Sequence, residues 1–326
     1  MIKRHSSIKI PHEIIQSFIA EVGMPKASEA ENISEVWKKV FNKFDNLNNR
    51  DTSNSSVSEI QSLFENYFVN GLSDGACVGK AMESIFTRYK YLSRERNRLG
   101  SLYLHRNPGV TKSYSRMGTN LKLTDQQYRN IISEMSSLNL SDLVFSGKPW
   151  MNISKGSSYL LELTDHYYFF DIVNRYMKNK VIKPIFIGEG SGILSNLFLT
   201  SNAVVQDAVF IDLQHFLIRQ YIINFSERNK VSNYIYAQDF QPSLIKSTGM
   251  TIINQDSFPE IPERALDSYF TPIKEGKIDR VISYNHLDLR GDHVDYRKML
   301  VGYFGEPLIR QESLVRKGYF IEIFEK

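Results

Sequence analysis

Two patterns of hydrophobic positions divide the chain near residue 150. Before it, apolar residues such as Ile14 and Phe18 recur at the three- and four-residue spacing of amphipathic helices. After residue 181, short β-rich runs alternate with helix-like segments, which is typical of a parallel sheet flanked by helices. The sequence therefore predicts a helical N-terminal domain over 1–150 and an α/β domain over 151–326.

Seven strands are predicted in the second half. In order, they are Ile182–Ile187, Val209–Leu213, Tyr234–Gln238, Met250–Asn254, Ile278–Tyr284, Leu308–Ser313 and Tyr319–Phe324. Helices are expected before the first strand and after the first, second and fourth, at Tyr159–Met177, Ile193–Thr200, His215–Glu227 and Pro262–Tyr269. The last two strands, separated by Val315–Gly318, are predicted to form an antiparallel hairpin.

Composition narrows the class of protein. Of 326 residues, 42% are hydrophobic and 23% charged, and the longest apolar runs fall far short of the roughly 20 residues of a membrane span. The single cysteine, Cys77, permits neither an internal disulfide nor a thiolate metal cluster, and 1–11 lacks a secretory signal pattern. A cytoplasmic location is therefore expected. The net charge of +4 does not indicate a nucleic-acid partner.

A glycine-rich turn follows the first predicted strand. Gly188, Gly190 and Gly192 stand at alternate positions before a predicted helix, so the backbone can turn sharply and approach a ligand closely. Asp212 ends the next strand, 22 residues after Gly190, where a carboxylate accepts hydrogen bonds from ribose hydroxyls. Together these residues predict an adenosine-type cofactor.

The spacing of the glycines separates two classes of cofactor. A dinucleotide site favours G-x-G-x-x-G, whereas this turn is G-x-G-x-G, which favours S-adenosylmethionine. The predicted cofactor site also includes Glu189, inside the turn, and Leu213, directly after Asp212. Asp239, after the third strand, is placed to meet the adenine edge, and Asn254, at the end of the fourth strand, lies next to the cofactor.

The residues after the fourth strand carry a more specific pattern. Residues 253–261 read I-N-Q-D-S-F-P-E-I and resemble the I-N-x-x-S-F-x-E-M stretch of the bacterial sugar O-methyltransferase family, which uses S-adenosylmethionine. The second strand and its helix, with I-D-L at 211–213 and Q-Y at 220–221, resemble the I-D-L-P-E…Q-Y-Y segment of that family. Ile261 replaces the family's Met, Pro259 a usual polar residue, and Gln214 its proline. The resemblance covers roughly residues 146–285.

This resemblance implies a fold, a reaction and an acceptor. The fold would be an α/β, Rossmann-like sheet of seven strands with a reversed strand, as in class I methyltransferases, and the N-terminal helices would form the acceptor pocket and a dimerisation surface. The reaction would be methyl transfer to a hydroxyl of a sugar or glycoside, such as one bound for a surface polysaccharide. One position departs from the pattern, because Phe186 stands where class I methyltransferases usually have an acidic residue.

Candidates for the acceptor side follow the carboxyl ends of the fourth and fifth strands, where open α/β sheets bind ligands. A base assists methylation of a hydroxyl, and His286 is suited because the ordinary histidine pKa is near neutrality. Ser257 and Glu260 are also expected to face the acceptor, although Glu260 equally suits a cap of the next helix. Asp256 and Asp288 with His286 would offer ligands to Mg²⁺, but no obligatory metal is predicted.

Other readings remain open at this point. The loop Leu104–Thr119 is predicted to cover the site, and its residues Arg106, Lys112 and Arg116 suit a phosphate on the acceptor. A methyltransferase acting on another small molecule would carry the same cofactor residues. A nicotinamide-dependent oxidoreductase is disfavoured by the glycine spacing, and Phe186 leaves room for a binding protein without catalysis.

Overall fold

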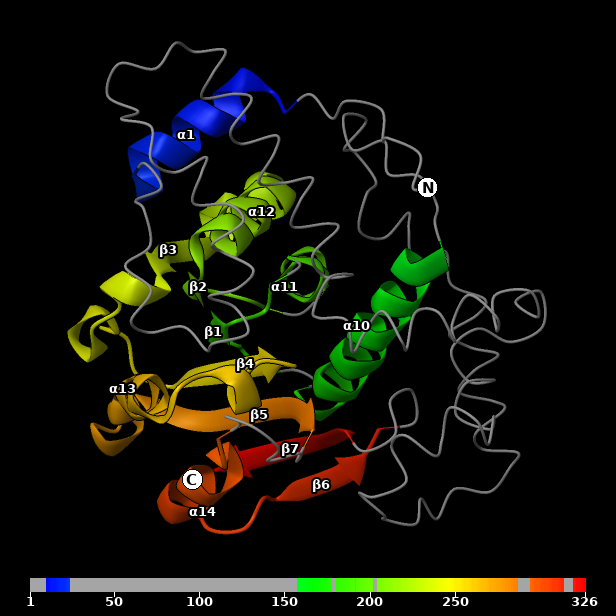
Figure 1. Ribbon diagram of the computed structural model, residues 1–326, viewed down its shortest axis with the longest axis vertical. Helices are drawn as coiled ribbons and strands as arrows, with labels where there is room; N and C mark the ends of the chain where they lie inside the picture. The colour runs from blue at the N-terminus through cyan, green and yellow to red at the C-terminus, as the bar shows by residue number, and fades with distance from the viewer. Residues whose placement is uncertain are drawn as a thin grey trace.

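The computed structural model describes residues 10–23, 157–177, 180–190, 192–201, 204–286, 294–313 and 319–326. The predicted domain boundary near residue 150, the loop Leu104–Thr119 and Asp288 lie outside these residues. Within them the chain forms one twisted sheet with helices on both faces (Figure 1).

The sheet has seven strands in the order β3-β2-β1-β4-β5-β7-β6. They are β1 Pro184–Ile187, β2 Ala208–Asp212, β3 Val231–Tyr236, β4 Met250–Gln255, β5 Ile278–His286, β6 Ile309–Glu312 and β7 Tyr319–Glu325. The first five strands pair in parallel, and β7 is antiparallel to both β5 and β6. The α/β fold class, with its Rossmann-like seven-stranded sheet and reversed strand, is therefore confirmed.

Six α-helices are described. They are α1 His12–Val22, α10 Ser157–Tyr176, α11 Ile193–Thr200, α12 Gln214–Asn224, α13 Glu263–Lys274 and α14 Tyr296–Phe304. Short 3₁₀ turns follow several elements, including η5 Phe225–Lys230, η6 Ala237–Asp239 and η8 Phe258–Glu260. No helix in this part of the chain is long and apolar enough to cross a membrane.

Several predicted boundaries differ from the structure by a few residues, and two of these differences have a physical reason. The third strand begins at Val231 rather than Tyr234, because Val231 and Asn233 already pair with β2. The helix predicted to end at Tyr269 continues to Lys274 through Pro272. Its buried face, which includes Ile273, continues past the predicted end, so packing outweighs the hydrogen bond that proline removes.

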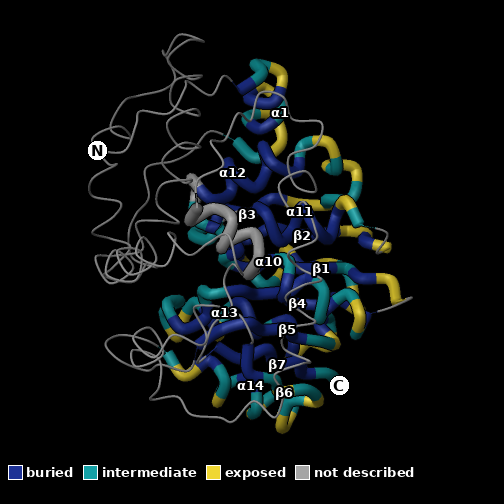
Figure 2. Tube along the Cα trace, turned by 90° about the vertical axis from the view of Figure 1, so that its right-hand side faces the viewer, coloured by how far each residue is buried: buried dark blue, intermediate teal, exposed yellow. Residues whose placement is uncertain are grey.

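Each face of the sheet buries its own hydrophobic core (Figure 2). Helices α1, α10, α11 and α12 cover one face, and α13 and α14 cover the other. Helix α1 belongs to the first core through the buried residues Ile14, Ile15 and Phe18. The ring of Phe18 meets Tyr221 of α12 edge-on with centroids 5.1 Å apart, and Tyr236 of β3 donates a hydrogen bond to the carbonyl of Gly23.

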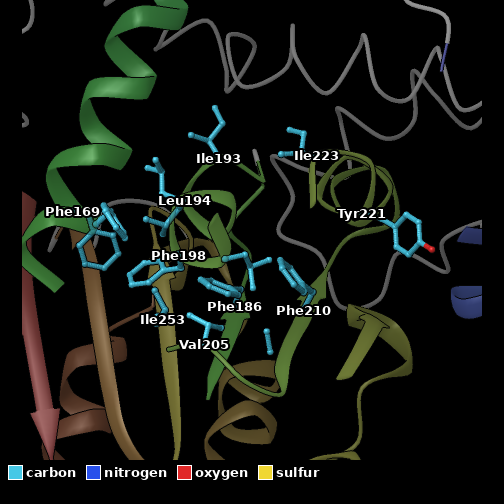
Figure 3. Packing of buried hydrophobic residues seen from close by; sticks show 14 of the residues in the cluster. Phe169, Phe186, Ile193, Leu194, Phe198, Val205, Phe210, Tyr221, Ile223 and Ile253 are labelled. Atoms are coloured by element: carbon cyan, nitrogen blue, oxygen red, sulfur yellow. The ribbon is translucent and has the colours of Figure 1, made fainter. Parts of the chain in front are cut away.

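Phe186, at the usually acidic position of β1, is part of the first core. It is 1% exposed, and its ring stacks on Phe210 with centroids 5.1 Å apart and contacts Phe198 at 5.9 Å (Figure 3). A carboxylate at this position would sit among aromatic rings. The Phe186 side chain therefore packs between the sheet and the helices that cover this face.

Candidate functional site

The glycine turn at the end of β1 has a left-handed backbone. Gly188, Gly190 and Gly192 have φ angles of 60°, 68° and 77°, a region that side chains other than glycine rarely adopt. Gly188 is the most tightly enclosed, because a Cβ there would lie 2.4 Å from Ser257 Oγ. At Gly190 the nearest atoms to a Cβ are in the ring of Phe216, 3.8 Å away. The turn thus packs against β4's loop at one end and is more open at its centre.

Asp212, at the end of β2, is bound directly to the glycine turn. Its Oδ2 accepts from the Gly190 amide at 2.9 Å and from Gln220 Nε2 at 2.6 Å, while its Oδ1 accepts from the Leu213 amide at 2.7 Å. Desolvation raises the pKa of Asp212 to about 7, and nearby Glu189 raises it further, against the lowering effect of the three hydrogen bonds. A carboxylate has about four acceptor positions, so Oδ1 retains capacity for a hydroxyl donor.

Glu189 is buried inside the turn and stabilises the start of helix α11. Its carboxylate accepts from the amides of Gly192 and Leu194 at 3.0 and 2.9 Å and from Ser195 Oγ at 3.1 Å. A negative charge at a helix N-terminus is stabilising, because the first amides of the helix have no partners within it. The structure therefore shows Glu189 capping α11, and its predicted contact with the cofactor stays a prediction.

Asn254 and Ser257 connect the end of β4 to the glycine turn. Asn254 Nδ2 donates to the Ile187 carbonyl at 2.6 Å and to Ser257 Oγ at 2.5 Å. Ser257 Oγ also donates to the Ile187 carbonyl, at 3.3 Å, and Asn254 Oδ1 accepts from Asn285 Nδ2 at 2.7 Å. These bonds hold β1, β4 and β5 together where the turn begins. Ser257 is thus hydrogen-bonded to residues at the start of the glycine turn. The sequence predicted that its side chain faces the acceptor.

The other predicted residues lie close to this edge of the sheet. Leu213, half-buried, directly precedes α12 and donates its amide to Asp212. Asp239 is exposed at the end of η6, just beyond β3. Glu260 ends η8 and donates its amide to the Ser257 carbonyl. Since Phe258 of η8 belongs to the core under α13, Glu260 lies toward that face of the sheet.

His286 lies in a second polar group, toward the α10 face. It ends β5, is 9% exposed and packs its ring edge-on against Tyr319 at the start of β7, with centroids 5.4 Å apart. Tyr319 Oη donates to Asp256 Oδ1 at 2.6 Å, and Asp256 has a φ of 62°, which turns the chain sharply after β4. The three residues predicted to face the acceptor thus lie in different places. Ser257 is bonded to the glycine turn, Glu260 lies toward the α13 face, and His286 packs against Tyr319.

Sequence reasoning missed a further pair in this group. His166 of α10 lies 2.8 Å from the side-chain oxygen of Gln255, measured from Nδ1, and both side chains are buried. Their separation of 89 positions gives no local signal. The alternation of side chains along β4 gives a partial signal. Gln255 stands two positions after Ile253, so it shares the face of the sheet that α10 covers.

The described residues hold no group of three or more His, Cys, Asp or Glu side chains arranged for a metal. They do hold the buried Asp212 carboxylate on the glycine turn. Beside it, two histidines, His166 and His286, lie with Tyr319 and Asp256 at the carboxyl ends of the neighbouring strands. The Asp212 carboxylate can bind the two hydroxyls of a ribose. The polar side chains one strand away from the glycine turn can exchange a proton with a hydroxyl.

Comparison with known proteins yields matches to solved structures alone. No family model matches the chain, and no curated protein matches it. Solved structures do match, and they include methyltransferases. The strand order and the reversed strand of this chain show a Rossmann-like α/β fold.

Three particular structures illustrate these matches. PH0226 protein from Pyrococcus horikoshii OT3 aligns over 56% of this chain and 97% of its own, with 15% identity and a TM-score of 0.41. The O-methyltransferase TomG from Streptomyces achromogenes, solved with S-adenosylmethionine, aligns over 63% and 99%, with 16% identity and a TM-score of 0.39. Magnesium protoporphyrin IX methyltransferase from Synechocystis PCC 6803 aligns over 64% and 100%, with 12% identity and a TM-score of 0.40. No acceptor or reaction is assigned to this chain from these similarities.

Proposed function

We propose that this chain is an S-adenosylmethionine-dependent O-methyltransferase acting on a hydroxyl of a sugar or glycoside. The observation that carries the proposal is the Asp212 carboxylate, buried against the glycine turn through the Gly190 amide. A buried carboxylate is costly unless it has partners. Here its remaining acceptor capacity suits the hydroxyls of a ribose.

The residues around Asp212 fit an adenosyl cofactor. A Cβ at Gly190 would make only van der Waals contact with the ring of Phe216, and Asp239 is exposed beyond the end of β3, the strand next to β2. Leu213 and Asn254 flank the turn, one on each side of β1. When bound, S-adenosylmethionine supplies an electrophilic methyl group on a positively charged sulfur.

The side chains of this chain would bind and orient the two reactants. Ser257 and Asn254 brace the turn on which the cofactor rests, so their effect on the reaction is through positioning. The polar group around His286, Asp256 and Tyr319 lies at the ends of β4, β5 and β7, where an acceptor hydroxyl would meet the methyl group. Glu260 remains a proposed contact of the acceptor.

The acceptor in this proposal is a sugar. It is supported by the I-N-x-x-S-F-x-E stretch of residues 253–260, and the cytoplasmic location, polysaccharide role and homodimer stand with it as proposals. A methyltransferase for another small molecule would share the cofactor residues. The choice of acceptor therefore has to be measured.

Calorimetric titration of the ligand-stripped full chain tests the cofactor. S-adenosylmethionine and S-adenosylhomocysteine should bind, NADH should not, and Asp212→Ala should lose most of the affinity. Asp267→Ala, a change of the same kind at an exposed position of α13, should retain it. Absence of adenosyl binding to the unmodified chain would refute the proposal. Transfer of labelled methyl groups to methyl glycosides, and not to phenols, would then support the sugar.

A further inference from the structure

Helix α12 packs one of its faces against the glycine turn. Phe216, Gln220 and Ile223 stand at helical spacing on this face. A Cβ at Gly190 would lie 3.8 Å from the ring of Phe216. A Cβ at Gly192 would lie 3.0 Å from Cα of Gln220 and 3.3 Å from Cδ1 of Ile223. The backbone of Gln220 is therefore held closely against the turn.

The side chain of Gln220 reaches from α12 to the Asp212 carboxylate. Nε2 of Gln220 donates to Oδ2 of Asp212 at 2.6 Å, and the two residues are only 1% and 4% exposed. The direction of the amide follows from its partner, because only the NH₂ end of the amide donates to a carboxylate oxygen. A hydrogen bond to a charged acceptor is also stronger than one between neutral groups. Gln220 thus stabilises the ionised form of Asp212.

The other end of the same amide is unsatisfied. Oε1 of Gln220 is buried and has no hydrogen-bond partner among the described residues. A buried acceptor without a partner costs free energy of folding, so an apolar side chain of similar length would suit this end of the residue better. The bond that Nε2 makes to Asp212 explains why an amide stands here.

Asp212 depends on such a donor because its surroundings oppose its negative charge. Burial raises the pKa of Asp212 to about 7, and three hydrogen bonds to its oxygens act in the opposite direction. Two of these bonds come from backbone amides, so Gln220 provides the one side-chain donor among the described residues. Without this donor, the carboxylate would take up a proton at a higher pH.

Three other ionisable groups lie on the elements around Asp212. Glu189, in the glycine turn, raises the pKa of Asp212. Burial and the Asp212 carboxylate both raise the pKa of Tyr269 on α13. Arg219, buried on α12, precedes Gln220 in the chain. A substitution of Gln220 leaves these three groups in place, so comparison with the unmodified chain isolates the contribution of the amide.

We propose that Gln220 is a positioning residue of the cofactor site, whose amide holds the Asp212 carboxylate in the charged form and the orientation that accept a ribose hydroxyl; this rests on the function proposed above. Gln220 acts through Asp212 and sets the pH range over which the adenosyl cofactor binds. Loss of the amide therefore displaces this range to higher pH. Loss of a merely structural contact would instead weaken binding equally at every pH.

The first readout needs no cofactor. In nitrogen-15 spectra of the full chain with labelled glutamine side chains, the Nε2 signal of Gln220 should change with pH as Asp212 ionises, with a midpoint at about pH 7. The signal is assigned by its absence in Gln220→Met or Gln220→Glu. Asp212→Asn should abolish the change. Absence of any glutamine signal that titrates in the unmodified chain and not in Asp212→Asn would overturn the proposal, whatever the chain binds.

The second readout is the affinity for S-adenosylhomocysteine, measured by calorimetry between about pH 5.5 and about pH 8.5. A hydrogen bond to a charged group shifts a pKa by about one to two units. Gln220→Met should therefore weaken binding by about 5- to 50-fold at about pH 7, and by less than about fivefold at about pH 8.5.

The matched control for this readout is Gln311→Met. Gln311 lies on β6, at the opposite edge of the sheet from β3 and β2, and its Nε2 donates to the hydroxyl of Tyr168. The control loses the same kind of donor and should bind as the unmodified chain does. Equal weakening of binding by Gln220→Met at every pH, or an unchanged affinity, would refute the positioning role. Absence of adenosyl binding by the unmodified chain would instead refute the proposed function.

Discussion

Affinity for S-adenosylmethionine is expected to decrease below neutral pH, because Asp212 must be ionised to accept hydrogen bonds from ribose hydroxyls. Its burial raises its pKa to about 7, far above the ordinary value for aspartate. A ligand that donates to the carboxylate favours the ionised form and lowers this pKa when it binds. Binding to the protonated protein therefore releases a proton.

The size of the effect follows from this linkage. Well below the pKa of the free protein, affinity changes tenfold for each pH unit, but at about pH 7 half of Asp212 is still ionised, so the decrease between about pH 7 and about pH 5.5 is about 16-fold, or about 1.6 kcal/mol. Folding shows the opposite sign. Because the folded pKa lies above the unfolded value of about 3.9, the free energy of unfolding falls as pH rises from about 4 to about 7 and is level above that.

Calorimetry over this pH range, in buffers of different ionisation enthalpy, gives both the affinity and the number of protons released. The matched control is Asp212→Asn, which retains an acceptor oxygen but has no charge to lose. Gln220 can adapt to it, because its buried Oε1 has no hydrogen-bond partner among the described residues and can accept from the new amide. A pH-independent affinity in the unmodified protein, or an equal pH dependence in Asp212→Asn, would refute the role of Asp212.

Three further predictions concern the turn and its strand. Gly188→Ala should lower the free energy of unfolding, measured in denaturant, by more than Gly190→Ala, since only the first Cβ meets Ser257 at 2.4 Å while both positions have positive φ; equal losses would contradict the close-packing argument. Phe186→Glu should destabilise the chain by about 3 kcal/mol or more without improving the cofactor Kd, because it buries a charge among aromatic rings; a tighter Kd in calorimetry would show that the acidic position is functional here. Glu189→Gln should cost about 1 kcal/mol of stability through the weaker helix cap, and thermal unfolding at the same temperature as the unmodified chain would exclude this.

The parts of the fold and site that were predictable depend on residues close in sequence. The glycine turn, and Asp212 after the next strand, follow from a local pattern of glycines and strand ends, and the structure joins them through the Gly190 amide. The five parallel strands were visible because buried parallel strands are continuous runs of apolar residues. Their ends were less predictable, since the start of β3 depends on its pairing with β2.

The remaining features depend on contacts that only the folded chain makes. Ser257 has the right sequence position for an acceptor contact, yet its hydroxyl binds Asn254 and the Ile187 carbonyl, 70 positions away. His166 lies in a helix whose aromatic residues indicated only core packing, and its partner Gln255 is 89 positions away. The end of the sheet that such a side chain reaches is visible only once the topology is known.

Helix α1 has a consequence for how the protein is made. Tyr236, which donates to the carbonyl of Gly23, is translated 213 residues later, and at about 5–20 residues per second this takes roughly 10–40 s. During this time the apolar face with Ile14, Ile15 and Phe18 cannot make its contacts with α12 and β3, which are not yet complete. The burial of this face against α12 and β3 is therefore a late event in the synthesis of the chain.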